Sequence, residues 1–347
     1  MPALAIADAL RALRSDVEPV LVGARRGIEA TLLPQRNHRF YLLPAEPLYR
    51  RAWWRNVRSL VVAPWTFAAA RRLLVREAPA VVVATGGYAC VPVLAAARLR
   101  HLPIVLQEAN AMPGLATRWF ARVARQVHLG FPEAADRLRT GHGTVVTTFG
   151  NPVAPPPSLD AGAARRQLGL PTDAPVVFAF GGSQGSHALN RTIAAALDMD
   201  LLSGVALCWG TGAREFERFR TYDRPPAVLV RPFWDPIAAV YRASDVVVAR
   251  AGAMTTSEVC AYGLPAILIP LPGAAADHQT RNAEALMAAG AARHIPETDL
   301  TPTALAGSVR RILGDPDLAS RMSQAALKRA APGASRRIAE AILELAG

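Results

Sequence analysis

Lysine is almost absent from this chain, because Lys328 is the only one among its 39 basic Lys and Arg residues. We attribute this bias toward arginine to genome base composition. The net charge of +12 still calls for an acidic partner: nucleic acid, anionic lipid or a phosphorylated substrate. The sequence contains no recognisable nucleic-acid-binding module and no basic ribbon interleaved with aromatic residues. We therefore expect no nucleic acid partner.

Cysteine is also scarce. The three cysteines, Cys90, Cys208 and Cys260, are odd in number and far apart. This spacing argues against a disulfide framework and against a zinc site, and it suits a reducing cytoplasm. No acidic cluster demands a metal, so we expect no metal site in the protein and no required cofactor. A divalent cation is not indicated, and metal dependence is left open by the sequence.

Long apolar runs are missing too, since none approaches the ~20 residues that span a bilayer. The segment 1–14 lacks a basic leader region and a cleavage site, so we expect no signal peptide there. With 51% hydrophobic and 19% charged residues, the composition is that of a packed globular protein. At 347 residues, two α/β domains are the expectation.

The most informative stretch is 245–258, DVVVARAGAMTTSE. Its run Val246–Val248 predicts a buried parallel strand. A small-residue turn follows and then a helix start, whose N–H groups would point beyond the end of the strand and suit an anion. Glu258, about one turn into this helix, can present a carboxylate to a pair of sugar hydroxyls. The alternative is an ordinary strand–helix junction with a solvated glutamate.

Other predicted strands end in similar residues. Gly86–Gly87 follow the strand at 81–85, and Glu108 and Asn110 follow the strand at 103–107. Ligands bind beyond the carboxyl ends of such strands, so we expect these residues to share one cleft.

The segment 181–186, GGSQGS, follows a predicted strand at 176–180. Its glycines would let a phosphate approach, and Ser183 would add a hydroxyl donor at a helix start. The next strand, at 205–209, ends without the carboxylate that a dinucleotide fold requires, and the chain has no Gly-Lys-Ser/Thr. A nicotinamide site and a P-loop are therefore excluded.

Two further segments suit a sugar nucleotide. In RPFWDP (231–236), Phe233 and Trp234 would cover a base edge or merely fill a core. In ADHQTRNA (276–283), Gln279 and Asn282 could read sugar hydroxyls through paired donors and acceptors. His278 is more simply a capping or surface residue.

The segment 50–77 mixes arginines with aromatic and aliphatic residues. One interpretation is a membrane-interface surface, with aromatics in the lipid and arginines at anionic headgroups. The other is an amphipathic helix packed on the sheet with solvated arginines. The aromatic residues of the membrane interpretation are Trp53, Trp54, Trp65, Phe67 and, beyond the segment, Trp119.

The proline cluster after GNPV (150–153) marks a domain boundary, because consecutive prolines continue neither strand nor helix. It separates an N-terminal domain, 1–150, from a second α/β domain.

The motifs occur in an order that resembles the MurG family of glycosyltransferases over essentially the whole chain. The matching segments are PALAIADAL, TGGY, E-x-N with AMPGL, GNPV, GGSQGS, RAGAMTTSE, GLPAILIP and DHQTRNA. The resemblance implies a GT-B fold of two Rossmann-like domains facing a cleft, 1–150 and 151–330, with a C-terminal helix, 331–347, crossing back to the first. It also implies a family 28-like hexosyltransferase at the cytoplasmic face of the cell membrane, held there peripherally.

The implied reaction moves N-acetylglucosamine (GlcNAc) from UDP-GlcNAc to lipid I, the undecaprenyl-pyrophosphoryl-MurNAc-pentapeptide of peptidoglycan synthesis, with inversion. Glu258 would hold the ribose, residues 253–257 the diphosphate and Gln279 the GlcNAc hydroxyls. Gly86, Gly87 and Tyr88 would lie on the acceptor side. The implied donor-binding residues are Asn110, Arg165 or Arg166, Ser183, Trp234, Ala253, Met254, Thr255, Thr256, Ser257, Glu258 and Gln279.

The chain departs from the family pattern at its beginning. The family has a strand and a glycine-rich loop, carrying the histidine favoured as base, directly before the segment that is Pro2–Leu10 here. The usual His-Glu-Gln-Asn is Gln107-Glu108-Ala109-Asn110, which leaves Glu108 as the candidate base. We expect the true start to lie upstream of Met1. The alternatives are a donor-binding protein with little activity and a transferase with another glycolipid acceptor.

Overall fold

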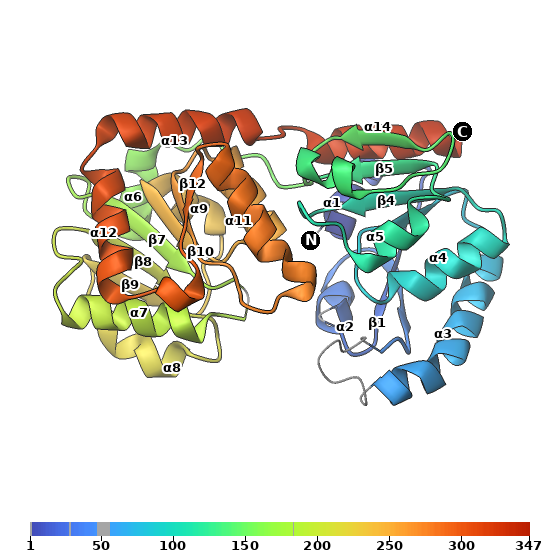
Figure 1. Cartoon of the computed structure of the whole chain (residues 1–347), viewed down its shortest axis with the longest axis horizontal. Helices are drawn as coiled ribbons and strands as arrows, with labels where there is room; N and C mark the ends of the chain where they lie inside the picture. The colour runs from blue at the N-terminus through green and yellow to red at the C-terminus, as the bar shows by residue number, and fades with distance from the viewer. Residues whose placement is uncertain (1, 28, 47–55, 183) are drawn as a thin grey trace. The chain divides into compact units, whose positions relative to one another are not determined.

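The structure is a computed structural model that describes residues 2–27, 29–46, 56–182 and 184–347. Trp53, Trp54 and Ser183 lie outside the described residues. The chain divides into two compact units (Figure 1). Unit 1 comprises Met1–Pro152 and Gly333–Gly347, and unit 2 comprises Val153–Pro332.

Unit 2 alternates strands and helices along almost its whole length. Its strands are β7 (Val176–Phe180), β8 (Ala206–Gly210), β9 (Val228–Arg231), β10 (Val246–Ala249), β11 (Ala266–Leu268) and β12 (Ala292–His294). Its α-helices are α6 (Ala161–Leu168), α7 (His187–Asp198), α8 (Phe216–Phe219), α9 (Ile237–Ala243), α10 (Ala253–Ala261), α11 (His278–Ala288), α12 (Pro302–Leu313) and α13 (Pro316–Arg329).

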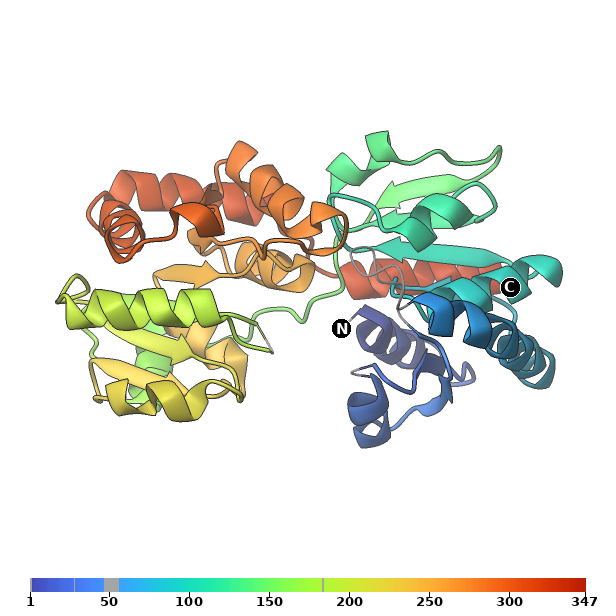
Figure 2. The ribbon, with the colours of Figure 1, turned by 60° about the horizontal axis from the view of Figure 1, so that its bottom comes forward.

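The six strands form one parallel sheet in the order β12-β11-β10-β7-β8-β9. Every residue of β7, β8 and β10 is buried, which explains why these segments read as continuous apolar runs. The strands predicted at 176–180, 205–209 and 246–248 are thereby confirmed. Figures 1 and 2 show helices enclosing this sheet.

Unit 1 contains two parallel sheets, β1-β2 and β3-β4-β5-β6. Their strands are β1 (Val20–Ala24), β2 (Arg39–Leu43), β3 (Val82–Ala84), β4 (Ile104–Glu108), β5 (Gln126–Leu129) and β6 (Val145–Thr148). The α-helices of this unit are α1 (Pro2–Leu13), α2 (Glu29–Leu32), α3 (Asn56–Glu77), α4 (Cys90–Leu99), α5 (Leu115–Phe120) and α14 (Ala334–Ala346).

The last helix, α14, returns to unit 1 and packs along α1. Its buried side chains recur at helical spacing, at Ala334, Ile338 and Ile342, so one face of the helix is apolar. Gln126 of β5 adds a polar tie by donating to the Ala341 carbonyl at 3.1 Å.

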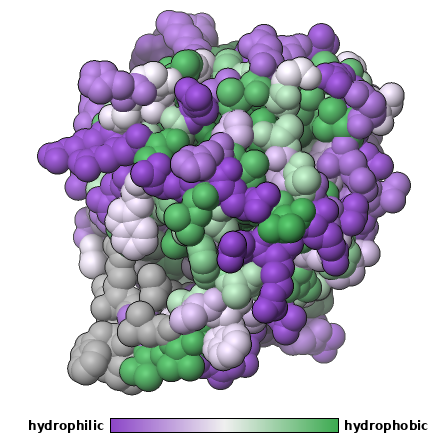
Figure 3. All heavy atoms as spheres, turned by 90° about the vertical axis from the view of Figure 1, so that its right-hand side faces the viewer, coloured by the Kyte–Doolittle hydropathy of each residue, from purple (hydrophilic) through white to green (hydrophobic). Residues whose placement is uncertain are grey.

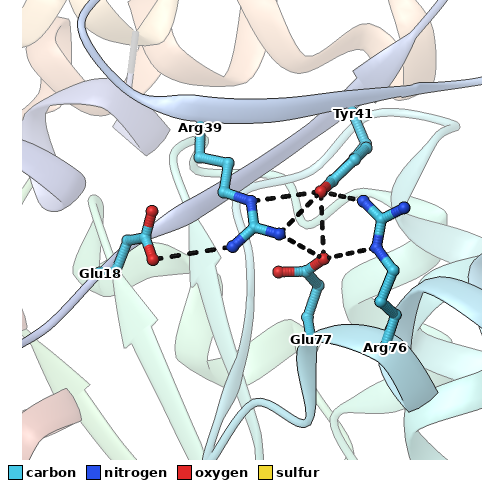
Figure 4. A network of polar contacts seen from close by, with 5 residues as sticks. All are labelled: Glu18, Arg39, Tyr41, Arg76 and Glu77. Atoms are coloured by element: carbon cyan, nitrogen blue, oxygen red, sulfur yellow. Dashed lines mark hydrogen bonds and ion pairs between the residues drawn. The ribbon is translucent and has the colours of Figure 1, made fainter.

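A polar network joins β2 to the end of α3 (Figure 4). The Glu77 carboxylate accepts hydrogen bonds from Arg76 at 3.0 Å and from Arg39 and Tyr41 at 3.1 Å. Arg76 also donates to the Tyr41 hydroxyl, and Glu18 lies 3.7 Å from Arg39. The bond from Arg76 is the largest cause of the lowered pKa of Glu77. The network therefore fixes the C-terminal end of α3 on the small sheet.

His128 is a buried, uncharged histidine on β5 in the four-stranded sheet of unit 1. It is only 1% exposed, its ring lies edge-on to Phe149 with centroids 5.0 Å apart, and Nε2 lies 3.0 Å from Gln126 Oε1. Burial lowers the pKa of His128 from 6.5 to about 4. Protonation of this ring therefore destabilises the folded state of unit 1.

We predict that His128 weakens unit 1 in acid. Below pH 6.5 the unfolded chain binds a proton that the folded chain refuses, so the free energy of unfolding falls between pH 6.5 and about 4. His128→Gln should remove up to about 2 kcal/mol of this dependence between pH 7 and 4.5, measured by denaturant unfolding. The exposed His142 offers the matched control, His142→Gln, which should leave the slope unchanged. An identical slope in His128→Gln and the unsubstituted chain would contradict the prediction.

Candidate functional site

The strand order places a switch point between β7 and β10. From these two neighbouring strands the chain order runs outward in opposite directions, to β8 and β9 on one side and to β11 and β12 on the other. Phe180 and Ala249, the last residues of the two strands, are paired in register. The segments that follow them, 181–186 and 250–258, therefore leave the sheet side by side, where open parallel sheets bind ligands.

The glycines of 181–186 have a structural use that the sequence did not reveal. Gly185 has φ +73°, and a Cβ there would lie 2.3 Å from the Thr211 carbonyl oxygen. A Cβ on Gly212 would lie 2.6 Å from the Gly185 backbone. The loops after β7 and β8 therefore pack backbone against backbone, and this packing requires glycine at both positions. The sequence had suggested only the approach of a phosphate as the reason for the glycines of 181–186.

A buried amide ties α7 to the end of β8 and the residue that follows it. Asn190 of α7 is fully buried and donates from Nδ2 to the Thr211 carbonyl at 2.9 Å. Its Oδ1 accepts from Trp209 Nε1, also at 2.9 Å. Both polar groups of the amide are thus used to fix the edge of the sheet.

The turn between β10 and α10 is clamped as well. Arg250, only 8% exposed, donates to the carbonyls of Ile269 and Pro270 at 3.2 and 3.0 Å and pairs with Glu297. Asn282, fully buried, donates to the Ala251 carbonyl at 3.0 Å. Asn282 therefore shapes the turn, and our expectation that it reads sugar hydroxyls is not supported.

The helix α10 begins at Ala253 behind Gly252, which has no side chain to cap it. The predicted diphosphate residues Ala253, Met254, Thr255 and Ser257 are half-buried in its first turns. Thr256 is different, because it is fully buried and donates to the carbonyls of Gly252 and Ala253. Thr256 therefore supports the turn from inside, and the backbone N–H groups at this helix start have the chemistry that suits an anion.

Glu258 is held by a neighbouring helix. Its Oε2 accepts a hydrogen bond from the Tyr241 hydroxyl of α9 at 3.0 Å. Burial raises the pKa of Glu258, while the bond from Tyr241 opposes that rise. The carboxylate is thus partly withdrawn from solvent and fixed by one of its two oxygens.

Trp234 and Gln279 also lie at the carboxyl edge of this sheet. A Cβ on Gly210, the last residue of β8, would lie 3.4 Å from the Trp234 ring, and the Arg231 guanidinium lies 5.9 Å from the ring centroid. Gln279 Oε1 accepts from the backbone N–H of Leu271 at 2.9 Å, which ties α11 to the segment after β11. The side-chain nitrogen of Gln279, Nε2, is then the group that could donate to a ligand.

Arg165 lies at the opposite edge of the sheet. It donates to Asp245 at 2.7 Å, and the same Asp245 oxygen accepts from the N–H of Val176. Asp245 and Val176 stand where β10 and β7 begin, so Arg165 is about 15 Å from the carboxyl ends of these strands. The expectation that Arg165 meets the diphosphate is therefore corrected, and the exposed Arg166 follows it on the same helix.

In unit 1, Glu108 ends β4 and is 4% exposed. Its carboxylate accepts from Asn110 N at 3.0 Å and Nδ2 at 3.2 Å, Gly114 N at 2.9 Å and Thr117 Oγ1 at 2.6 Å. The four bonds fix the segment 109–117 after the strand. Glu108 therefore has a structural role that the sequence did not reveal. Two of the four bonds come from Asn110, whose backbone N–H and side-chain amide both donate to Glu108.

Gly86 and Gly87 follow β3, which pairs with β4, so they share an edge with Glu108. Their φ values are +95° and +86°, and a Cβ on either would meet nothing within 4 Å. The left-handed backbone therefore requires glycine, and the surface above it is open. Tyr88 packs against a small apolar cluster that includes Ala24 and Ala45.

The described aromatic residues of the membrane hypothesis divide into two kinds. Trp65 and Trp119 are 72% and 54% exposed, whereas Phe67 packs against the core of unit 1. Val57, Val61 and Trp65 are all exposed and lie four residues apart on α3, so they form one apolar stripe. Figure 3 shows hydrophobic side chains gathered at the lower edge of this face, beside the grey atoms.

Trp119 lies in a second, basic surface. It lines a pocket of about 440 Å³ whose other lining residues are Arg118, Arg122, Arg137 and Arg139. Four arginines and one tryptophan lining the same pocket give a surface suited to anionic groups with an apolar neighbour.

Two further observations concern the described residues. None of their helices has the length and hydropathy needed to cross a membrane. Among them, no group of three or more His, Cys, Asp or Glu side chains is arranged to hold a metal ion.

Comparisons with protein families and with individual relatives indicate the same family. The glycosyltransferase family 28 N-terminal domain matches residues 1–129, and the family 28 C-terminal domain matches residues 176–338. The chain is 40% identical over 352 aligned positions to the UDP-N-acetylglucosamine–N-acetylmuramyl-(pentapeptide) pyrophosphoryl-undecaprenol N-acetylglucosamine transferase of Salinibacter ruber. That alignment covers 99% of this chain and 93% of the relative. The enzyme of the same name from Desulforudis audaxviator is 36% identical over 100% of this chain and 95% of its own length.

Solved structures agree. The crystal structure of Acinetobacter baumannii MurG has a TM-score of 0.77 and 26% identity, covering 99% of this chain and 95% of that one. A Staphylococcus aureus MnaA–UDP structure has a TM-score of 0.68 at 15% identity, over 99% and 94% of the two chains, and shows likeness of fold alone. The parallel sheets, the switch point and these matches lead to one conclusion: the chain belongs to glycosyltransferase family 28 and, within it, to the MurG family of GT-B enzymes.

Proposed function

We propose that this chain transfers GlcNAc from UDP-GlcNAc to lipid I and so forms lipid II. The relatives with 35–40% identity carry this activity in their names. The observation that supports the proposal for this chain is the clamped edge of unit 2, where a helix start behind a glycine and a fixed carboxylate lie within one helix, α10. That combination suits the diphosphate and the ribose of a nucleotide sugar.

The donor would lie along the carboxyl edge of the unit 2 sheet. The diphosphate would bind the N–H groups at the start of α10, and Glu258 would bind the ribose hydroxyls. Trp234 would lie beside the base, and the amide group of Gln279 would meet the GlcNAc hydroxyls. The half-buried residues 253–257 would shape the diphosphate site, with Thr256 acting from inside the helix.

The reaction would be a single displacement with inversion. The acceptor hydroxyl oxygen forms a bond to the anomeric carbon as the bond from that carbon to the UDP phosphate oxygen breaks. The departing UDP gains negative charge, which the positive end of α10 would stabilise. A base takes the hydroxyl proton.

Glu108 as that base stays a prediction, and its four internal hydrogen bonds argue against it. The open glycines Gly86 and Gly87 and the neighbouring Tyr88 remain the proposed acceptor side. The proposal does not depend on which group takes the proton.

The activity is tested by transfer of labelled GlcNAc. We expect label from UDP-GlcNAc in lipid I and none in other glycolipids offered to the same protein. Transfer to a different glycolipid alone would assign another acceptor. Binding of UDP-GlcNAc without transfer to any lipid would support a donor-binding protein.

Glu258→Gln should weaken donor binding without unfolding the protein. Losing a charged acceptor of the ribose hydroxyls costs about 1.5–3 kcal/mol, or roughly 10- to 100-fold in Kd for UDP-GlcNAc. Titration calorimetry would measure it. The matched control is Glu284→Gln, an exposed glutamate of α11 paired with Arg281, which should leave the Kd unchanged. Equal affinities in both variants would remove Glu258 from the site.

We further propose that unit 1 binds the anionic inner face of the cell membrane peripherally. The exposed stripe on α3 would enter the lipid interface, and the arginines around Trp119 would meet anionic headgroups. This surface would bring the protein to its lipid-linked acceptor.

Trp65→Ser should reduce binding to vesicles that contain phosphatidylglycerol by about fivefold or more, because one exposed indole leaves the interface. Sedimentation with vesicles measures the bound fraction. Leu99→Ser is the control, because Leu99 is 69% exposed and lies on a different helix, α4. If both substitutions have the same effect, or if neutral lipid retains the protein equally well, the membrane proposal is wrong.

A further inference from the structure

Tyr241 is a buried tyrosine whose hydroxyl faces the proposed nucleotide site. The residue is 1% exposed on α9. Its ring meets those of Phe178 and Phe180 edge-on, at centroid distances of 5.5 and 6.1 Å. The Tyr262 ring packs against the Tyr241 ring, with their centroids 4.9 Å apart. Three aromatic neighbours therefore fix the ring, and with it the position of the hydroxyl.

The hydroxyl donates a hydrogen bond to the Oε2 atom of Glu258 at 3.0 Å. Burial is the largest cause that raises the pKa of Tyr241 well above 10, so its proton stays on and the group donates. A carboxylate accepts through two oxygens. With Oε2 engaged by Tyr241, Oε1 is the oxygen that can serve a ligand.

The support of Tyr241 continues outward to Tyr262 and Arg242. The Arg242 guanidinium lies 5.4 Å from the Tyr262 ring centroid and donates to the Pro157 carbonyl at 2.9 Å. Tyr262 thus lies between Arg242 and Tyr241. This arrangement leaves the Tyr241 hydroxyl little freedom to follow a rotating carboxylate.

We propose that Tyr241 is a positioning residue for nucleoside recognition: it holds Glu258 by one oxygen and aims the other at the two hydroxyls of the donor ribose. The inference rests on the proposed role of Glu258. It adds that the ribose preference depends on a tyrosine that does not itself contact the ligand. The substituted side chain would keep its ring packing in Tyr241→Phe and lose only the hydroxyl.

The expected effect is selective for the ribose hydroxyls. Tyr241→Phe should weaken UDP binding about five- to tenfold, since a freely rotating carboxylate binds the hydroxyls less well. Affinity for the dideoxyribose analogue of UDP, which lacks both hydroxyls, should stay unchanged. The ratio of the Kd of the analogue to the Kd of UDP should therefore fall by the same five- to tenfold. A merely structural role would weaken the binding of both ligands equally and leave this ratio unchanged.

The experiment is calorimetry of UDP and its dideoxyribose analogue with five proteins. These are the unsubstituted chain, Tyr241→Phe, Tyr262→Phe, Glu258→Gln and the double variant of Tyr241→Phe with Glu258→Gln. Tyr262→Phe is the matched control, because it removes a neighbouring hydroxyl that does not contact Glu258, and should keep the ratio. In the Glu258→Gln background, Tyr241→Phe should have no further effect on it.

The outcomes separate the two claims. If Glu258→Gln lowers the ratio but Tyr241→Phe does not, the positioning role is overturned and the ribose assignment stands. If Glu258→Gln leaves the ratio unchanged, the ribose assignment itself fails and the inference fails with it. An equal loss of affinity for both ligands in Tyr241→Phe would mean that Tyr241 acts only on packing.

Discussion

Parallel strands end at one edge of a sheet, and this constraint decides where unit 2 can bind a ligand. The order β12-β11-β10-β7-β8-β9 places the first and fourth strands of the unit side by side. From these two strands the chain continues toward opposite ends of the sheet, which is the arrangement that creates a ligand-binding crevice in open α/β sheets. The glycine loop, the start of α10, Trp234 and the segment before α11 all derive their location from that order.

The edge is held by groups that a ligand would not touch. Arg250, Asn282 and Asn190 are buried, and each bonds backbone carbonyls of the loops around the site. A buried polar group that lost its partner would cost about 1–3 kcal/mol, so these loops are fixed before any ligand arrives. Preorganisation of this kind lowers the entropy lost on binding and keeps the helix dipole aimed at one place.

The sequence was sufficient for the strands and for the turns that follow them. Buried parallel strands leave continuous apolar runs such as Val246–Val248, and glycine turns follow them in the chain, so both can be read locally. Sequence reasoning failed where an assignment needed the partner of a side chain. The family resemblance assigns Arg165 or Arg166 to the diphosphate, yet Arg165 is paired with Asp245, which lies 80 residues away in the chain, at the amino edge. Asn282 reads as a ligand-binding amide, yet it bonds the chain beneath the turn.

The central claim is that unit 2 binds the nucleotide at the carboxyl ends of β7 and β10. A crystal structure of the protein with UDP bound tests it most directly. The account predicts the diphosphate against the backbone N–H groups at the start of α10 and the ribose hydroxyls within hydrogen-bond distance of Glu258. UDP bound at the amino edge near Arg165, or with its ribose remote from Glu258, would contradict it.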